Sequence, residues 1–212
     1  MSRRGALLLM GLGTLLIAST GAAACQARPA GDFVAPVPAV SPAPVPAGPV
    51  VPVNDGRPPS KAAADAPTRL SIPAVKITAP VDAVGIDDAT GDFAVPGAGR
   101  AGWYRFGPGL TATAGSIVVA GHVDSTIEDR GVFFRLDDVE AGDEVVLTGA
   151  DGRTRTFRVT ARERHRKTAI PLAKYFARDG AARLTLITCG GPFDRKTRHY
   201  RDNVVVTAVP TA

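Results

Sequence analysis

The pattern of hydrophobic and polar positions divides the chain into three parts. The first is an almost uncharged apolar run, the second is poor in large apolar side chains and rich in Pro, and the third repeats short β-branched runs between turn residues. These patterns predict an export signal or anchor at 1–25, a Pro-rich linker at 26–68 and one folded domain at 69–210. The third part has the length of a common single domain with one sizeable core.

The pattern of the third part is typical of a mainly β protein. Runs of β-branched residues bounded by Gly, Pro, Asp and Asn predict strands at 69–72, 75–78, 115–120, 143–148, 155–160, 183–188 and 203–208. Asp151-Gly152 favours a hairpin turn between Val146 and Phe157. A helical pattern is confined to Ile170–Arg178, where we expect one or two turns. The domain is therefore predicted to be a β sandwich or barrel with little helix.

The N-terminus has the features of an export signal. Arg3 and Arg4 precede the apolar run, and small residues end it at Ala24, directly before Cys25. Cleavage there with lipidation of Cys25 is one interpretation, and release after cleavage is a second. The run is also long enough to stay as a membrane-spanning anchor, with Arg on the inner side. All three interpretations place the domain outside the cytoplasmic membrane.

Proline content sets the second part apart. Most of the 18 Pro residues lie between Pro29 and Pro67, alternating with Val and Ala. Such a segment buries too little apolar surface to fold alone and favours extended polyproline geometry. We interpret it as a spacer between membrane and domain. The alternative is a disordered linker that has no spacer function.

Charge and cysteine content exclude some classes of function. The formal net charge is +5, but the basic residues alternate with acidic ones and aromatic residues make up only 6% of the chain. This does not produce the basic, aromatic surface of a nucleic-acid-binding protein, so we expect no nucleic acid partner. The two cysteines, Cys25 and Cys189, are too few for a disulfide framework.

Cys189 is the strongest candidate for chemistry in the domain. It follows the apolar run Leu184–Thr188 and precedes Gly190, where a strand is expected to break into a loop. A thiol needs a basic neighbour to act as a nucleophile, and His122 ends a second such run. His199 is an alternative base in a polar stretch. A buried, structural Cys189 is the competing interpretation.

His165 and Arg201 are two further basic side chains in the predicted domain. His165 lies among Arg and Lys residues, where we expect an exposed or partner-contacting side chain. Arg201 precedes the last apolar run, where it is placed to donate to an oxyanion, as acyl transfer requires. An Arg at a strand end is also typical of an ordinary surface charge.

These positions together resemble the sortases, cysteine transpeptidases of Gram-positive cell surfaces. Thr185–Cys189 reads Thr-Leu-Ile-Thr-Cys, which matches the family's Thr-Leu-x-Thr-Cys signature, while Gly121-His122 and Arg201 match its His and Arg. The stretches 120–125, 131–136 and 188–194 are most similar to class F sortases of actinobacteria. The resemblance implies a closed eight-stranded β-barrel with short helices.

The resemblance also implies a mechanism and partners. Cys189 attacks the Thr–Gly carbonyl of a Leu-Pro-x-Thr-Gly-like sorting signal, His122 moves protons and Arg201 holds the substrate and its oxyanion. Thr188 is expected to contact the peptide. The implied partners are secreted proteins with a C-terminal sorting signal and an amine acceptor in peptidoglycan. No cofactor is implied, and because residues 161–174 are basic, we expect no calcium or other metal.

Three alternatives remain open from the sequence. One is another exported Cys–His peptidase or acyl-transferase that acts on peptidoglycan itself. A second is a sortase that mainly hydrolyses its substrate. The third is a tethered binding lipoprotein, without catalysis, in which the thiol is incidental.

Overall fold

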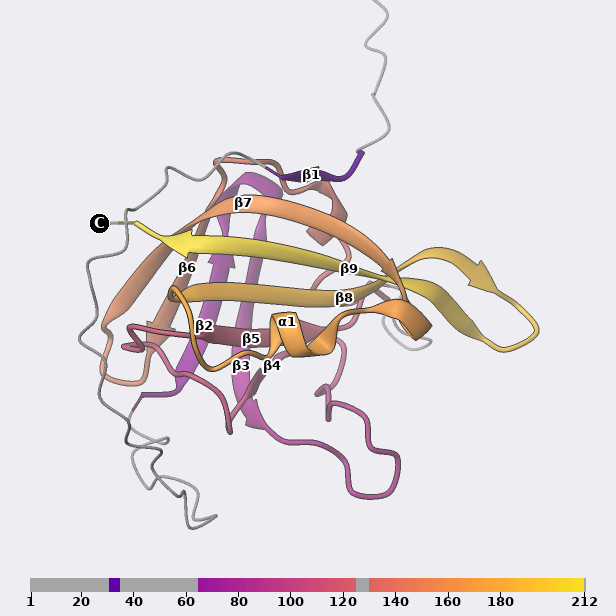
Figure 1. The fold of residues 1–212 in the computed structure, drawn as a ribbon, viewed down its shortest axis with the longest axis horizontal. Helices are drawn as coiled ribbons and strands as arrows, with labels where there is room; N and C mark the ends of the chain where they lie inside the picture. Colours follow the sequence, from indigo (N-terminus) through magenta and orange to yellow (C-terminus); the bar gives the residue numbers. More distant parts are fainter. Residues whose placement is uncertain (1–30, 35–64, 125–129, 212) are drawn as a thin grey trace, which may run out of the picture.

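Eight strands of the protein close a β-barrel in the computed structural model, which describes residues 31–34, 65–124 and 130–211 (Figure 1). The strands are β1 (Phe33–Val34), β2 (Pro67–Ile72), β3 (Ile77–Val84), β4 (Ala101–Tyr104), β5 (Ser116–Gly121), β6 (Glu144–Gly149), β7 (Thr154–Arg166), β8 (Arg183–Asp194) and β9 (His199–Pro210). The sheet order is β1-β7-β6-β2-β3-β4-β5-β8-β9, and β7 also pairs with β9. That pairing closes the barrel and leaves β1 as an additional short strand.

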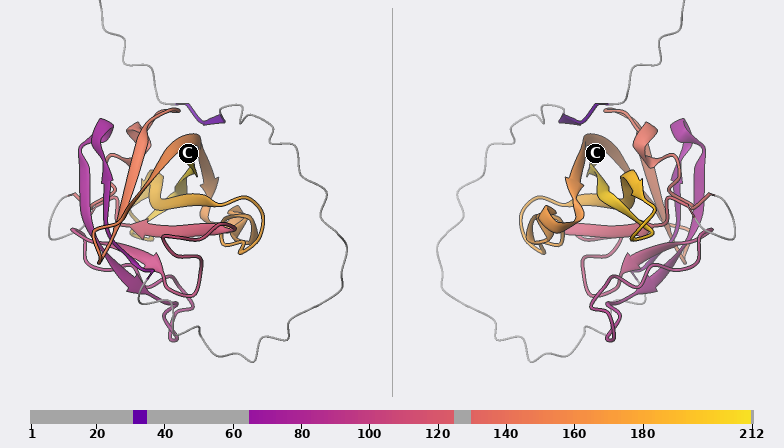
Figure 2. Two further views of the ribbon diagram at one scale, coloured as in Figure 1. Left: turned by 90° about the vertical axis from the view of Figure 1, so that its left-hand side faces the viewer. Right: turned by 90° about the vertical axis from the view of Figure 1, so that its right-hand side faces the viewer.

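Helices in the described ranges are short. They are the 3-10 helices η1 (Pro73–Val75), η2 (Leu136–Asp138) and η3 (Lys167–Ala169), and the single turn α1 (Leu172–Tyr175). Both views of Figure 2 show the η3–α1 connection on the outer side of the barrel. No helix in these ranges is long and apolar enough to cross a membrane.

Alternating apolar residues of the strands fill the interior. Trp103, Phe133 and Phe157 are among the largest fully buried side chains. Burying a side chain of this kind contributes about 1.5–3 kcal/mol relative to leaving it in water. All six residues of β5 are buried, because β5 lies inside the sheet between β4 and its parallel neighbour β8. Packing in the core therefore fixes the positions of β5 and of the first half of β8.

The mainly β, closed-barrel prediction is confirmed. The hairpin around Gly152 is also present, and the strand expected at 75–78 begins later, after η1. The sequence pattern missed β4, which has only four residues and includes Gly102. The strands predicted at 155–160, 183–188 and 203–208 are shorter than the observed β7, β8 and β9. The additional residues are largely polar, and pairing with the neighbouring strand orders them.

Several predictions concern residues outside the described ranges. These are the signal at 1–25, with Cys25, and most of the linker at 26–68. Within that linker range, the structure describes two pieces that contact the barrel. They are the strand β1 and the first residues of β2.

Candidate active site

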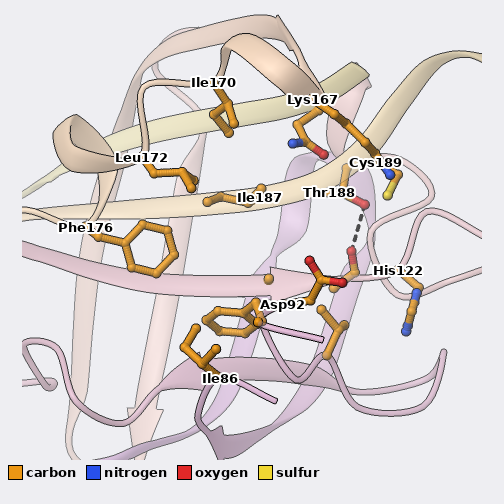
Figure 3. A pocket seen from close by; sticks show the side chains of 16 residues that line it. Ile86, Asp92, His122, Lys167, Ile170, Leu172, Phe176, Ile187, Thr188 and Cys189 are labelled. Carbon is orange, nitrogen blue, oxygen red and sulfur yellow. Dashed lines mark hydrogen bonds between the residues drawn. The ribbon is translucent and has the colours of Figure 1, made fainter. Parts of the chain in front are cut away.

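The parallel pair β5 and β8 brings the two main candidates together. Their paired register ends at Ala120 and Ile187. Because parallel strands run in the same direction, the residues that follow lie at the same edge of the sheet. His122 comes directly after β5, and Cys189 comes two residues after Ile187. The sheet thus places the imidazole and the thiol at one end of one cleft (Figure 3).

That cleft has a volume of about 390 Å³ and two chemically different ends. Its polar end includes His122, Lys167, Thr188, Cys189 and Asn203. Its apolar end includes Ile86, Phe93, Ile170, Leu172, Phe176 and Ile187. Figure 3 shows the apolar side chains at the opposite end from Cys189 and His122. A cleft of this kind fits an extended peptide with an apolar part next to the bond that reacts.

Cys189 is a free, partly exposed cysteine within β8. The strand does not break there as the sequence suggested, but continues through a bulge between Gly190 and Phe193. Gly191 lies in this bulge at φ 70°, a conformation that favours glycine. No hydrogen bond joins Cys189 to His122, both of which the structure describes. The two side chains are neighbours across the cleft without being bonded.

Thr188 lines the cleft and also makes a hydrogen bond that links two strands. Its side chain is 4% exposed, and Oγ1 donates a 2.8 Å hydrogen bond to the carbonyl oxygen of Gly121. Gly121 is the residue before His122, so this bond ties the Cys189 strand to the base of the His122 loop. Substrate contact by Thr188 stays a prediction.

The backbone of the His122 loop is held closely. The amide of Phe133 donates to the His122 carbonyl oxygen over 2.9 Å, and Gly131 donates to Val123 over 3.0 Å. A Cβ atom on Gly131 would overlap the His122 carbonyl group. Only glycine therefore allows this approach of the two segments, which sets the position of the imidazole.

A second contact ties this loop to the β8–β9 hairpin. The Tyr200 hydroxyl donates to Asp124 Oδ2, and the Phe193 ring packs edge-on against Tyr200 with centroids 5.1 Å apart. The hydrogen bond to Asp124 raises the pKa of Tyr200 to about 12, with contributions from burial and from the charges of Asp124 and Cys189. Asp124 and Tyr200 were not identified from the sequence, since only the fold brings them together.

Arg201 lies within β9, not before it, and its side chain is exposed. It is not among the residues that line the cleft, and in the described ranges it makes no ion pair. Alternation along β9 places it on the same face as Asn203, which does line the cleft and lies directly across from Cys189. Its catalytic role stays a prediction. Asn203 was missed because no sequence signal fixes the β8–β9 register.

The apolar wall of the cleft is held by a partly buried polar network between β7 and α1. His165 Nε2 lies 2.6 Å from the hydroxyl of Tyr175, which donates over 3.0 Å to Glu163 Oε2. Lys174 Nζ donates to both oxygens of Glu163, over 3.1 and 3.0 Å. His165 is partly exposed, and its imidazole bonds inside this network, while contact with a partner stays a prediction. His199 is exposed at the start of β9 and does not line the cleft.

The network shifts the protonation of its members. Burial raises the pKa of the Tyr175 phenol, and the hydrogen bond to Glu163 and its charge raise it further. For Glu163, burial raises the pKa, but hydrogen bonds from Lys174 and Tyr175 outweigh this and lower it below its ordinary value. At neutral pH, Glu163 is therefore a carboxylate that accepts bonds from the cleft wall.

Within the ranges that the structure describes, no group of three or more His, Cys, Asp or Glu side chains is arranged to hold an ion.

Comparison with known proteins gives one family. A family model described as a sortase domain matches residues 70–211. No curated protein matches the chain.

Solved structures with the same fold include sortase A from Corynebacterium diphtheriae. Its lid mutant is 22% identical with a TM-score of 0.52, and the match covers 68% of this chain and 69% of that one. A second structure of that sortase A is 21% identical with a TM-score of 0.52, covering 69% and 61%. Sortase C2 of pilus island 1 from Group B Streptococcus is 16% identical with a TM-score of 0.51, covering 68% and 73%.

Proposed function

The chain belongs to the sortase family of cysteine transpeptidases, and we propose that it cleaves a Leu-Pro-x-Thr-Gly-like sorting signal between Thr and Gly. It then transfers the protein to an amine of the cell envelope, or to water. The observation that supports this most is the single cleft in which Cys189 and His122 meet at one end of an apolar wall. A nucleophile and a proton carrier beside a binding surface are what acyl transfer from a peptide needs.

The proposed reaction has two steps. In the first, the Cys189 thiolate attacks the Thr carbonyl carbon, the C–N bond to Gly breaks and His122 protonates the leaving amine. In the second, the incoming amine attacks the thioester and gives a proton to His122, and the Cys189 thiolate leaves. Arg201 holds the peptide and stabilises each oxyanion, which requires its exposed guanidinium to reach the substrate beyond the cleft edge.

Each end of the cleft has its own part in this proposal. The Leu and Pro side chains of the signal pack on the apolar end, beside Ile170, Leu172 and Phe176. This places the Thr–Gly bond near Cys189. Thr188 contacts the peptide backbone or Thr side chain next to the nucleophile.

We further propose a class F sortase of an actinobacterial type, based on the stretches 120–125, 131–136 and 188–194. The domain acts outside the cytoplasmic membrane and is held there by its N-terminal segment or by a lipid on Cys25. Its protein partners are secreted proteins with a C-terminal sorting signal, and the amine acceptor belongs to peptidoglycan.

A quenched sorting-signal peptide tests the proposal, with and without an amine acceptor. Wild type is expected to cut at Thr–Gly and, with the amine present, to form the amide product. Arg201→Ala should lower kcat/KM by about 10²-fold or more, as loss of an oxyanion donor does, while Arg195→Ala on the exposed hairpin should not. Cleavage of peptidoglycan stems in place of the signal peptide would favour the rival peptidase.

A further inference from the structure

A short segment before the barrel binds to it, because Phe33 and Val34 pair with β7. Phe33 lies opposite Arg162 and Val34 opposite Ala161, in antiparallel register. Figure 1 shows β1 alongside β7. We propose that Gly31–Val34 is a docking strand, which ties the chain to the barrel ahead of the Pro-rich linker, so that the residues before Gly31 set the reach of the domain.

The sheet has one open edge where this strand fits. β9 pairs with one edge of β7 from Phe157 to Arg166. β6 pairs with the other edge, but only up to Arg158. Beyond a bulge after Val159, no barrel strand in the described ranges pairs with that second edge, and β1 pairs with it at Ala161 and Arg162. An unpaired strand edge favours addition of an extended segment through main-chain hydrogen bonds.

Arg162 gives this docking its specificity. The residue is 2% exposed, and charged residues are buried to this extent almost only when they are paired. One guanidinium nitrogen donates to the Gly31 carbonyl oxygen over 2.6 Å, and the other donates to Val139 over the same distance. The guanidinium also stacks 5.0 Å from the centre of the Phe33 ring. Without Gly31 and Phe33, this buried charge would lose two of its contacts.

The two side chains of the strand face different surroundings. Phe33 is partly buried and packs against the hydrophobic core, whereas the Val34 side chain is 70% exposed. Docking therefore depends on Phe33 and on the Gly31 carbonyl, not on Val34. Phe33→Ala and Val34→Ala are therefore a test variant and its matched control.

The docking changes how far the domain can reach. Val34 and Asp65, the described residues on either side of 35–64, both contact the barrel, through β7 and through a hydrogen bond from the Leu110 amide to the Asp65 carbonyl oxygen. If the N-terminus is anchored as proposed above, the distance between anchor and barrel is set by the residues before Gly31. The segment 35–64 does not lengthen it.

Hydrogen exchange of the full chain tests the docking without any measurement of activity. In an antiparallel pair, alternate residues face the partner strand, so one of the two amides of Phe33 and Val34 donates to β7. In wild type, that amide should exchange at least about tenfold more slowly than in an unfolded chain. Phe33→Ala should lose this protection and lower the Tm by about 4 °C or more, whereas Val34→Ala should keep both. The absence of protection at both amides in wild type, or equal effects of the two variants, would overturn the proposal.

Insertion variants test the effect on reach. The same short Gly-Ser segment is inserted either before Gly31 or within 35–64, and energy transfer is measured between a dye at Lys196 and a dye in the membrane. Only the insertion before Gly31 should reduce the transfer. An equal reduction from both insertions contradicts the docking. Because neither readout involves cleavage, failure here is distinct from failure of the proposed transpeptidation.

Discussion

The two ends of the cleft are built in different ways. At the reacting end, Cys189 and His122 extend from two core strands, and backbone contacts hold them in place. At the apolar end, Ile170, Leu172 and Phe176 lie on a connection outside the sheet, which is bonded to β7 through the side chains of Lys174, Tyr175 and Glu163. Under the proposed function, the reacting groups are therefore positioned by the barrel itself, while preference for the apolar part of the peptide depends on the η3–α1 connection.

The first prediction asks whether the reacting end acts on the chemical step. His122→Gln should lower kcat by about 10²–10⁴-fold with little change in KM, because proton transfer is lost while the apolar wall is intact. Steady-state kinetics with a sorting-signal peptide measures both. His199→Gln is the control, since that exposed imidazole lies outside the cleft. If only His199→Gln lost activity, the base would be His199 and the assignment of this role to His122 would be wrong.

The second prediction displaces the reacting end without removing any of its groups. Gly131→Ala places a methyl group against the His122 carbonyl, so the loop must move. A misplacement of about 1 Å can cost about 10²-fold, and we expect kcat to fall by about 10–100-fold. Gly97→Ala is the control, because its added methyl group meets no atom within 4 Å. If the two variants had equal activity, the loop would not position His122.

The third prediction concerns the apolar end. Leu172 is 53% exposed, so Leu172→Ser should fold normally but bind the peptide less well. Loss of part of an apolar contact is expected to raise KM by about five- to tenfold, with kcat nearly unchanged. Phe134→Ser removes a similarly exposed apolar side chain away from the cleft. A fall in kcat without a rise in KM would contradict the separation of the two ends.

The fourth prediction concerns the polar network behind the apolar end. The pKa of Glu163 is lowered in the folded protein, so its charged form stabilises the fold above its ordinary pKa near 4.5. This contribution is lost as the pH falls through the lower, folded value. Glu163→Gln should lower the Tm by about 2–5 °C at pH 7, with a smaller difference from wild type in acid.

Thermal melts from pH 3 to 7 test this, with the exposed Glu140→Gln as the control. The KM of Glu163→Gln should rise about two- to threefold, since the wall loses its support. A difference in Tm that is the same at every pH would show that the charge of Glu163 is not the cause.

Much of the reacting end could be predicted from the sequence, because apolar runs end at His122 and Cys189. The length of β8 could not, since its polar half is ordered only by pairing with β9. Asn203 and Tyr200 enter the site through strand register and contacts between distant segments, which no local pattern encodes. The same holds for β1, where two residues become a strand only because β7 offers an open edge.

The central claim is that Cys189 is the nucleophile at the reacting end of this cleft. Mass spectrometry of the intact protein, trapped with a sorting-signal peptide in the absence of amine, tests it most directly. We predict a thioester adduct of the peptide up to its Thr on Cys189, absent in Cys189→Ala and discharged by an added amine. Cleavage that continues in Cys189→Ala, or an adduct on another residue, would contradict the account.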